Sequence, residues 1–241
     1  MVVTATKNLS TEVKSTLAAA KDNKYTMLYL PIHGVVTALR AMLIMSGAEY
    51  EFAHPTDWSQ EKSLTPFGSM PVLYEQTKSG EILELAELSA IEFYIGQKHG
   101  WVGDNLWEQN LVRMYCSSTQ SLFDKLVTTV VRAPKPHQGE MMEIFQHKIL
   151  PEWVRFHERA LVQNGANGHY VGEKLTIADL KTASIIDNLV TISGEAFVSR
   201  EKTPAIMAVY DAVEKIPKYA EWKVTEAWRK YDEGNKALAG F

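Results

Sequence analysis

The stretch from Thr65 to Ile95 limits most strongly what this chain can fold into. Its opening, Thr65-Pro66-Phe67-Gly68, contains the Pro and Gly of a tight turn. A short β run then starts at Pro71, a return strand follows over 82–85, and apolar residues recur at helical spacing from Leu88. The stretch therefore predicts a β-hairpin that is entered through a proline and followed by a helix.

The segment before this stretch has the pattern of a β-α-β unit. A β run over 25–30 precedes a helical pattern over 35–45, and a second strand is predicted over 48–53. A crossover of this length joins parallel strands. Asp57 then offers a helix cap in a polar stretch. Joined to the hairpin and its helix, the unit predicts a thioredoxin-like α/β domain.

The rest of the chain has helical periodicity. A long amphipathic helix is predicted over 111–131, a second over 139–162 with an interruption near Pro151, and a third from Leu175. Shorter helices are predicted over 204–215 and from Pro217 to about Trp228. We therefore predict four parts: an N-terminal extension (1–24), a thioredoxin-like domain (25–98), a linker (99–106) and an all-α C-terminal domain (107–241).

Composition narrows the class of protein. The chain has 46% hydrophobic and 22% charged residues, which is typical of globular proteins. A net charge of -4 without a basic run argues against a nucleic-acid partner. No run approaches the roughly 18 apolar residues of a membrane span, and residues 1–24 lack the features of a signal or transit peptide. We therefore predict a cytoplasmic protein without a membrane partner, whose N-terminal extension is mobile or helical.

Two further features are predicted to be structural. Cys116 is the only cysteine, which excludes an intrachain disulfide and an all-cysteine metal site. Because it lies in a helical pattern, we expect a buried thiol, and no metal site is predicted. Thr176 and Asp179 have the spacing of a capping box at a helix start.

Several short motifs together resemble one protein family. The chain is similar to the cytosolic glutathione transferases of the tyrosine-type, sigma-like group over about residues 25–228. The motifs are Tyr29-Leu30-Pro31, Gly34 with Arg40, Ala48–Glu51, Trp58 with Lys62, Thr65–Gly68, Met70–Leu73, Glu87 with Ala90-Ile91, the capping box, and Ile216-Pro217 with Trp222. The combination is specific for the fold, although no single motif is.

The resemblance implies an enzyme and its substrates. A glutathione S-transferase would conjugate glutathione to a small hydrophobic electrophile, and related enzymes isomerise endoperoxides or reduce peroxides. It implies a homodimer, Tyr29 as the catalytic residue and an electrophile site between the domains near Tyr115. The implied glutathione-binding residues are Trp58, Lys62, Ser69, Met70, Pro71, Glu87, Leu88 and Ser89, with Lys62 on the glycyl carboxylate, Glu87 near the γ-glutamyl group and Met70-Pro71 as a cis peptide.

The chemistry assigned to Tyr29 follows from thiol ionisation. A free thiol has a pKa near ~8.5, and a hydrogen bond donated to the thiolate lowers it. The alternative for Tyr29 is an aromatic residue packed at the end of a strand. Cysteine-type and serine-type relatives would need a Cys or Ser after this strand, and residues 27–45 contain neither, which leaves Thr37 as a distant candidate for the hydroxyl.

Several positions depart from the family pattern. His33 and Val35 replace two arginines, and Val35 thereby removes a cation that supports the thiolate. Ser69 replaces Gln, and Leu88 replaces a hydroxyl residue that binds the γ-glutamyl carboxylate. Arg113 reverses the charge of an Asp that reaches the partner subunit's glutathione. The second hypothesis is therefore a non-catalytic binding or structural protein with a drifted glutathione site. His33 is expected to be an exposed turn residue, or else a replacement base.

Overall fold

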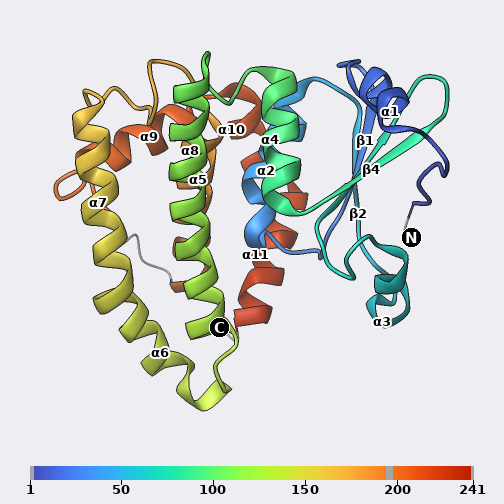
Figure 1. Ribbon diagram of the computed structural model, residues 1–241. Coiled ribbons are helices and arrows are strands. Elements are labelled where there is room, and N and C mark those ends of the chain that lie inside the picture. The colour runs from blue at the N-terminus through green and yellow to red at the C-terminus, as the bar shows by residue number, and fades with distance from the viewer. Residues whose placement is uncertain (1–2, 194–197, 240–241) are drawn as a thin grey trace. The chain divides into compact units, whose positions relative to one another are not determined.

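The computed structural model describes residues 3–193 and 198–239, and it divides into two compact units (Figure 1). Unit 1 comprises Met1–Pro31 and Leu39–His99, and unit 2 comprises Ile32–Ala38 and Gly100–Phe241. The short segment Ile32–Ala38 thus interrupts unit 1 in sequence and belongs to unit 2.

Unit 1 is built on a four-stranded mixed sheet with the strand order β2-β1-β3-β4. Strand β2 pairs with β1 in parallel, whereas β3 pairs with β1 and β4 in antiparallel fashion. The strands are β1 (Lys24–Leu28), β2 (Tyr50–Ala53), β3 (Val72–Gln76) and β4 (Ile82–Ala86). The predicted thioredoxin-like arrangement of strands and hairpin is confirmed.

Helices connect and cover these strands. They are α2 (Thr37–Ser46), α3 (Trp58–Glu61) and α4 (Leu88–His99), with α1 (Thr11–Ala18) in the N-terminal extension. The predicted cap at Asp57 is confirmed, because its carboxylate accepts a hydrogen bond from the Ser59 amide at 3.0 Å. A 3₁₀ turn over Gly34–Val36 precedes α2.

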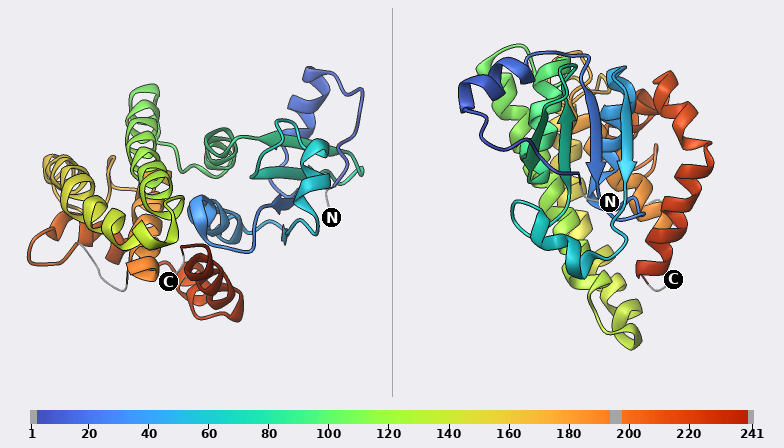
Figure 2. Two further views of the ribbon diagram at one scale, coloured as in Figure 1. Left: turned by 90° about the horizontal axis from the view of Figure 1, so that it is seen from below. Right: turned by 90° about the vertical axis from the view of Figure 1, so that its right-hand side faces the viewer.

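The N-terminal extension wraps around one edge of the sheet. Val3 packs against the cluster that contains Leu28 and Tyr74. Thr6 pairs with β4, since its amide donates to the Ile82 carbonyl at 2.9 Å and its hydroxyl accepts from the Ile82 amide at 2.8 Å. The right-hand view of Figure 2 shows this dark blue segment crossing the sheet before α1. The extension therefore covers an edge strand that would otherwise offer unpaired backbone groups.

Unit 2 is all-helical, as predicted. Its helices are α5 (Leu106–Leu126), α6 (Gln138–Ile144), α7 (Leu150–Gln163), α8 (Ile177–Ser193), α9 (Pro204–Glu214), α10 (Pro217–Lys223) and α11 (Glu226–Ala239). Helix α8 is central and packs against α5, α9 and α11. The predicted buried state of Cys116, on α5, is confirmed.

The helices of unit 2 end where their sequences disfavour continuation. The predicted interruption near Pro151 is confirmed, because a π-helical turn over Phe145–Ile149 separates α6 from α7. The predicted capping contact is present between the Thr176 amide and the Asp179 carboxylate at 2.7 Å. Glu158 of α7 also accepts hydrogen bonds from the first amides of α9.

One helix prediction was wrong. A single helix was expected from Pro217 to about Trp228, but α10 ends at Lys223 and a new helix, α11, begins at Glu226. The Thr225 hydroxyl accepts a hydrogen bond from the Trp228 amide at 3.2 Å, so Thr225 caps the new helix.

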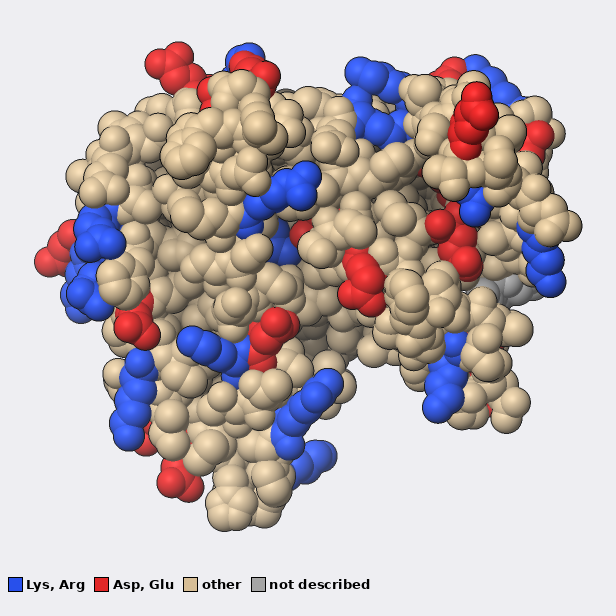
Figure 3. Space-filling view, viewed as in Figure 1, with Lys and Arg blue, Asp and Glu red and all other residues tan. Residues whose placement is uncertain are grey.

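The surface carries charges of both signs. On the face in Figure 3, basic and acidic side chains are interspersed over each unit. Within residues 3–193 and 198–239, no helix combines the length and the apolar character needed to cross a membrane.

Candidate functional site

Most of the site residues predicted in unit 1 lie on segments that meet at one end of the sheet. Leu28 of β1 is paired with Val72 of β3, which is paired in turn with Ala86 of β4. This row aligns three segments that lie immediately beyond it in the chain. They are Tyr29, Met70-Pro71 and Glu87–Ser89. Residues far apart in sequence thus share one border of the sheet.

The backbone that carries Tyr29 is held from two sides. Its amide donates to the Ala53 carbonyl at 3.1 Å, and its carbonyl accepts from His54 Nδ1 at 2.8 Å. Arg40 of α2 is fully buried and donates from Nη2 to the Leu30 carbonyl at 3.1 Å. Its guanidinium carbon lies 5.8 Å from the centre of the Tyr29 ring. These contacts fix the position of the Tyr29 backbone, from which the half-buried phenol side chain extends.

The sequence did not predict a role for His54, and it did not predict which residues Arg40 contacts. The signal for His54 was its place directly after β2, because a parallel strand beside β1 ends at the same border of the sheet. Arg40 was recognised as part of the family pattern. That it reaches back to the turn after Tyr29 depends on the tertiary structure.

The segments beyond β3 and β4 have distinctive backbones. The Met70-Pro71 peptide is cis, as predicted, and Ser69 before it is exposed. Glu87 has φ 73°, which is costly for a residue with a side chain. It leads directly into α4, where Leu88 and Ser89 carry amides of the first helical turn. Such a turn presents N–H groups that suit a carboxylate.

Helix α3 contributes the other two candidates. Trp58 is half-buried, and Lys62 is exposed. The Lys62 carbonyl accepts hydrogen bonds from the amide and the hydroxyl of Thr65, which fixes the end of α3 to the loop before β3. Lys62 forms no ion pair within the part of the chain that the structure describes. Its ammonium group is therefore available to an anionic ligand.

In unit 2, Tyr115 lies on α5 and is half-buried in a cluster of aromatic rings. Its ring centre lies 4.7 Å from that of Tyr170 and 6.1 Å from that of His157, and burial raises the pKa of its hydroxyl. Val35 is half-buried, whereas Arg113 is exposed.

His157 is the buried polar centre of this cluster. The Thr182 hydroxyl donates to the Tyr170 hydroxyl at 3.1 Å, which leaves the Tyr170 proton to donate to His157 Nδ1 at 2.7 Å. His157 Nε2–H then donates to Ser118 Oγ at 2.9 Å. The imidazole is therefore neutral and does not act as a base toward Ser118. Burial lowers its pKa to about 4.

This burial predicts a dependence of stability on pH. Because the folded pKa lies below the unfolded value near ~6.5, the stabilisation is complete above pH ~6.5 and is lost as the pH falls toward 4. We expect the free energy of unfolding to fall by about 2 kcal/mol between pH 7.5 and 5 from this group alone. Urea denaturation at the two pH values measures it. His157→Gln should remove that part of the dependence, whereas the exposed His137→Gln should not; equal slopes in all three proteins would contradict the assignment.

The prediction that His33 is an exposed turn residue was wrong. Its side chain is buried in unit 2, and Nε2–H donates to the Trp228 carbonyl at 3.1 Å. The physical reason is a contact between residues 195 positions apart in sequence, which local turn chemistry does not reveal.

Comparison with known proteins finds similarity to glutathione S-transferases. Residues 120–226 match the family model described as "Glutathione S-transferase, C-terminal domain". The chain is 24% identical to a Schistosoma japonicum glutathione S-transferase, class-mu 28 kDa isozyme, over 70% of this chain and 82% of that protein. It is 22% identical to glutathione S-transferase 3 of Caenorhabditis elegans, over 82% and 94% respectively.

A solved structure extends the comparison to the fold. Monomeric Na-GST-3, a glutathione S-transferase of the hookworm Necator americanus, matches with a TM-score of 0.71 and 23% identity, over 84% of this chain and 97% of that one. Sequence similarity and fold therefore agree, because the chain is similar in sequence to glutathione S-transferases and has the fold of a solved member of that group.

Proposed function

We propose that this protein is a glutathione S-transferase that conjugates glutathione to small hydrophobic electrophiles. The observation that carries the proposal is the row Leu28–Val72–Ala86, which aligns the segments of Tyr29, Met70-Pro71 and Glu87 at one border of the sheet. The relatives named glutathione S-transferases support the same activity.

In this proposal Tyr29 activates the thiol of glutathione. The phenol hydroxyl donates a hydrogen bond to the sulfur, which stabilises the thiolate and lowers the thiol pKa. The thiol proton passes to solvent. The thiolate then attacks an electrophilic carbon, and the sulfur–carbon bond forms as a leaving group departs with the electron pair. The protein supplies no nucleophile of its own, so its contribution is to orient glutathione and stabilise the charge on sulfur.

The remaining candidates would hold the tripeptide. Lys62 and Trp58 would contact the glycyl end, and the Met70 backbone would pair with the cysteinyl residue in the manner of an added strand. The amides of Leu88 and Ser89 and the Glu87 side chain would meet the γ-glutamyl group, with Ser69 at the border. The electrophile would contact Tyr115. The proposal also expects a homodimer in the cytoplasm.

The departures from the family pattern favour a second candidate function. Val35 offers no cation, Leu88 offers no hydroxyl, and Arg113 carries the opposite charge to the family's Asp. If these changes have abolished turnover, the protein is a non-catalytic binding or structural protein that keeps the fold.

Calorimetric titration with glutathione, followed by a conjugation assay with 1-chloro-2,4-dinitrobenzene, separates the two candidates. We expect binding below millimolar glutathione and product formation that requires protein. Binding without turnover would favour the non-catalytic candidate. Absence of binding at millimolar glutathione would contradict the proposed enzyme.

A further inference from the structure

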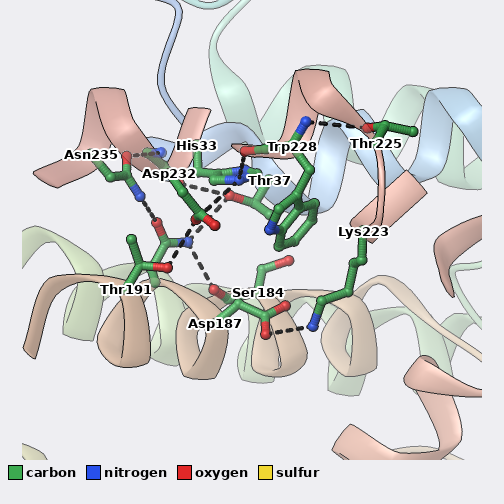
Figure 4. A network of polar contacts seen from close by, with 12 residues as sticks. His33, Thr37, Ser184, Asp187, Thr191, Lys223, Thr225, Trp228, Asp232 and Asn235 are labelled. Carbon is green, nitrogen blue, oxygen red and sulfur yellow. Dashed lines mark hydrogen bonds and ion pairs between the residues drawn. The ribbon is translucent and has the colours of Figure 1, made fainter. Parts of the chain in front are cut away.

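The segment that follows the proposed catalytic tyrosine is itself part of unit 2. Residues Ile32–Ala38, called here the anchored segment, begin three positions after Tyr29 and lead into α2. Their polar contacts with α8 and α11 form the network in Figure 4. No part of the proposed glutathione chemistry uses these contacts.

His33 fixes the start of the anchored segment. Its ring centre lies 4.1 Å from that of Trp228, 5.5 Å from that of Tyr231 and 6.0 Å from that of Trp222, and its side chain is only 3% exposed. These three rings form an aromatic cage around the imidazole. The hydrogen bond from Nε2–H to the Trp228 carbonyl sets the orientation of the ring within the cage. Asp232 Oδ1 lies 3.4 Å from the same nitrogen.

The side chain of Asn235 fixes the middle of the anchored segment by binding the segment's main chain. Its Oδ1 accepts from the Gly34 amide at 3.1 Å, and its Nδ2 donates to Asn188 Oδ1 at 2.7 Å. Asn188 Nδ2 in turn donates to Thr37 Oγ1 at 3.2 Å. Asn235 is 5% exposed and Asn188 2% exposed, so water does not compete for these bonds.

The directions of these bonds determine both amide orientations. Because the Gly34 amide can only donate, Asn235 must present its oxygen to it and its nitrogen to Asn188. The Thr37 hydroxyl donates to the Gly34 carbonyl at 3.2 Å and therefore accepts from Asn188. Each hydrogen bond in this series therefore joins a donor to an acceptor. The series ties the anchored segment to two helices, α8 and α11.

We propose that His33 and Asn235 are positioning residues for Tyr29. This inference rests on the proposed function. The β1 strand and His54 hold one end of the Tyr29 backbone, and the anchored segment holds the chain just beyond it. Loosening that segment would let the turn after Tyr29 move and would misplace the phenol hydroxyl, and small displacements of a group that stabilises charge cost much of its effect.

The test compares Asn235→Ala with Glu233→Ala, an exposed change on the same helix. The first readout is amide hydrogen exchange over residues 29–38 in the ligand-free protein. The second is the pKa of glutathione in the binary complex, measured from thiolate absorbance. The third is kcat and KM for glutathione. We expect faster exchange, a thiol pKa raised by about one unit and kcat roughly tenfold lower, with KM changed less than about twofold.

Two conservative variants keep the test decisive. Asn235→Gln retains both an acceptor for the Gly34 amide and a donor for Asn188, and it should lie between wild type and Asn235→Ala. His33→Gln retains a donor for the Trp228 carbonyl and should exceed His33→Ala in kcat. These variants replace Asn235→Ala if it does not fold.

The outcomes separate this inference from the proposed function. Unchanged exchange in Asn235→Ala and His33→Ala would overturn the anchoring, whatever glutathione does. Faster exchange with unchanged thiol pKa and kcat would overturn the positioning role. If wild type binds no glutathione, the proposed function fails and the positioning inference fails with it, while the exchange data still report the anchoring.

Discussion

Replacing Tyr29 by Phe is expected to lower kcat/KM for glutathione conjugation roughly 100-fold, because the donor that we propose for the thiolate is lost. The ring remains, so its contact with the guanidinium of Arg40 is kept. Glutathione affinity should change far less than turnover, since the hydroxyl acts on charge that develops at the sulfur. Steady-state kinetics with 1-chloro-2,4-dinitrobenzene measure the loss.

A matched control lies four residues earlier, on β1. Tyr25→Phe makes the same chemical change at a fully buried ring, whose burial raises the pKa of its hydroxyl. We expect full activity in this variant. Turnover in Tyr29→Phe equal to that of Tyr25→Phe would reject the role assigned to Tyr29.

The largest stability effect is expected at Glu75 in β3. Its carboxylate is buried and accepts from Lys98 Nζ at 2.6 Å and from Asn23 Nδ2 at 2.6 Å, with the Tyr94 hydroxyl as a third donor. Glu75→Ala leaves the Lys98 ammonium buried without its counter-charge. We expect a loss of about 3–5 kcal/mol in the free energy of unfolding, measured by urea denaturation.

The physical cause can be isolated with a second variant. Glu75→Leu combined with Lys98→Met removes both charges and keeps the volume, and it should recover most of the stability. Disrupting the exposed pair of Asp22 with Lys78 by Asp22→Ala should leave the unfolding midpoint unchanged. A double variant as unstable as Glu75→Ala would show that the unpaired ammonium is not the cause.

Much of the fold could be predicted because its signals are local. The hairpin after Pro71, the helix that starts at Leu88 and the interruption at Pro151 follow from turn residues, periodicity and proline chemistry. The alignment of the Tyr29, Met70 and Glu87 segments follows once the strand register is known. That register depends on pairings between β1 and β3, which single-strand patterns do not determine.

The contacts of His33 could not be predicted in the same way. Turn chemistry around Gly34 indicates exposure, whereas the observed burial depends on α11, the helix that sequence reasoning missed. Its signal was present, because Trp228, Tyr231 and Asn235 recur at helical spacing and are all buried. Because Asn235 is polar, this buried face does not form a continuous apolar pattern in the sequence.

The anchored segment has a consequence for exchange of parts between relatives. Residues 32–38 lie within the first hundred residues but complete the core of unit 2, so a single cut in the linker does not separate two self-sufficient modules. A chimera that joins the first half of a relative to the second half of this chain would place a foreign side chain among Trp222, Trp228 and Tyr231. Functional hybrids should therefore require that residues 32–38 and α11 come from the same parent protein, although the two are far apart in the sequence.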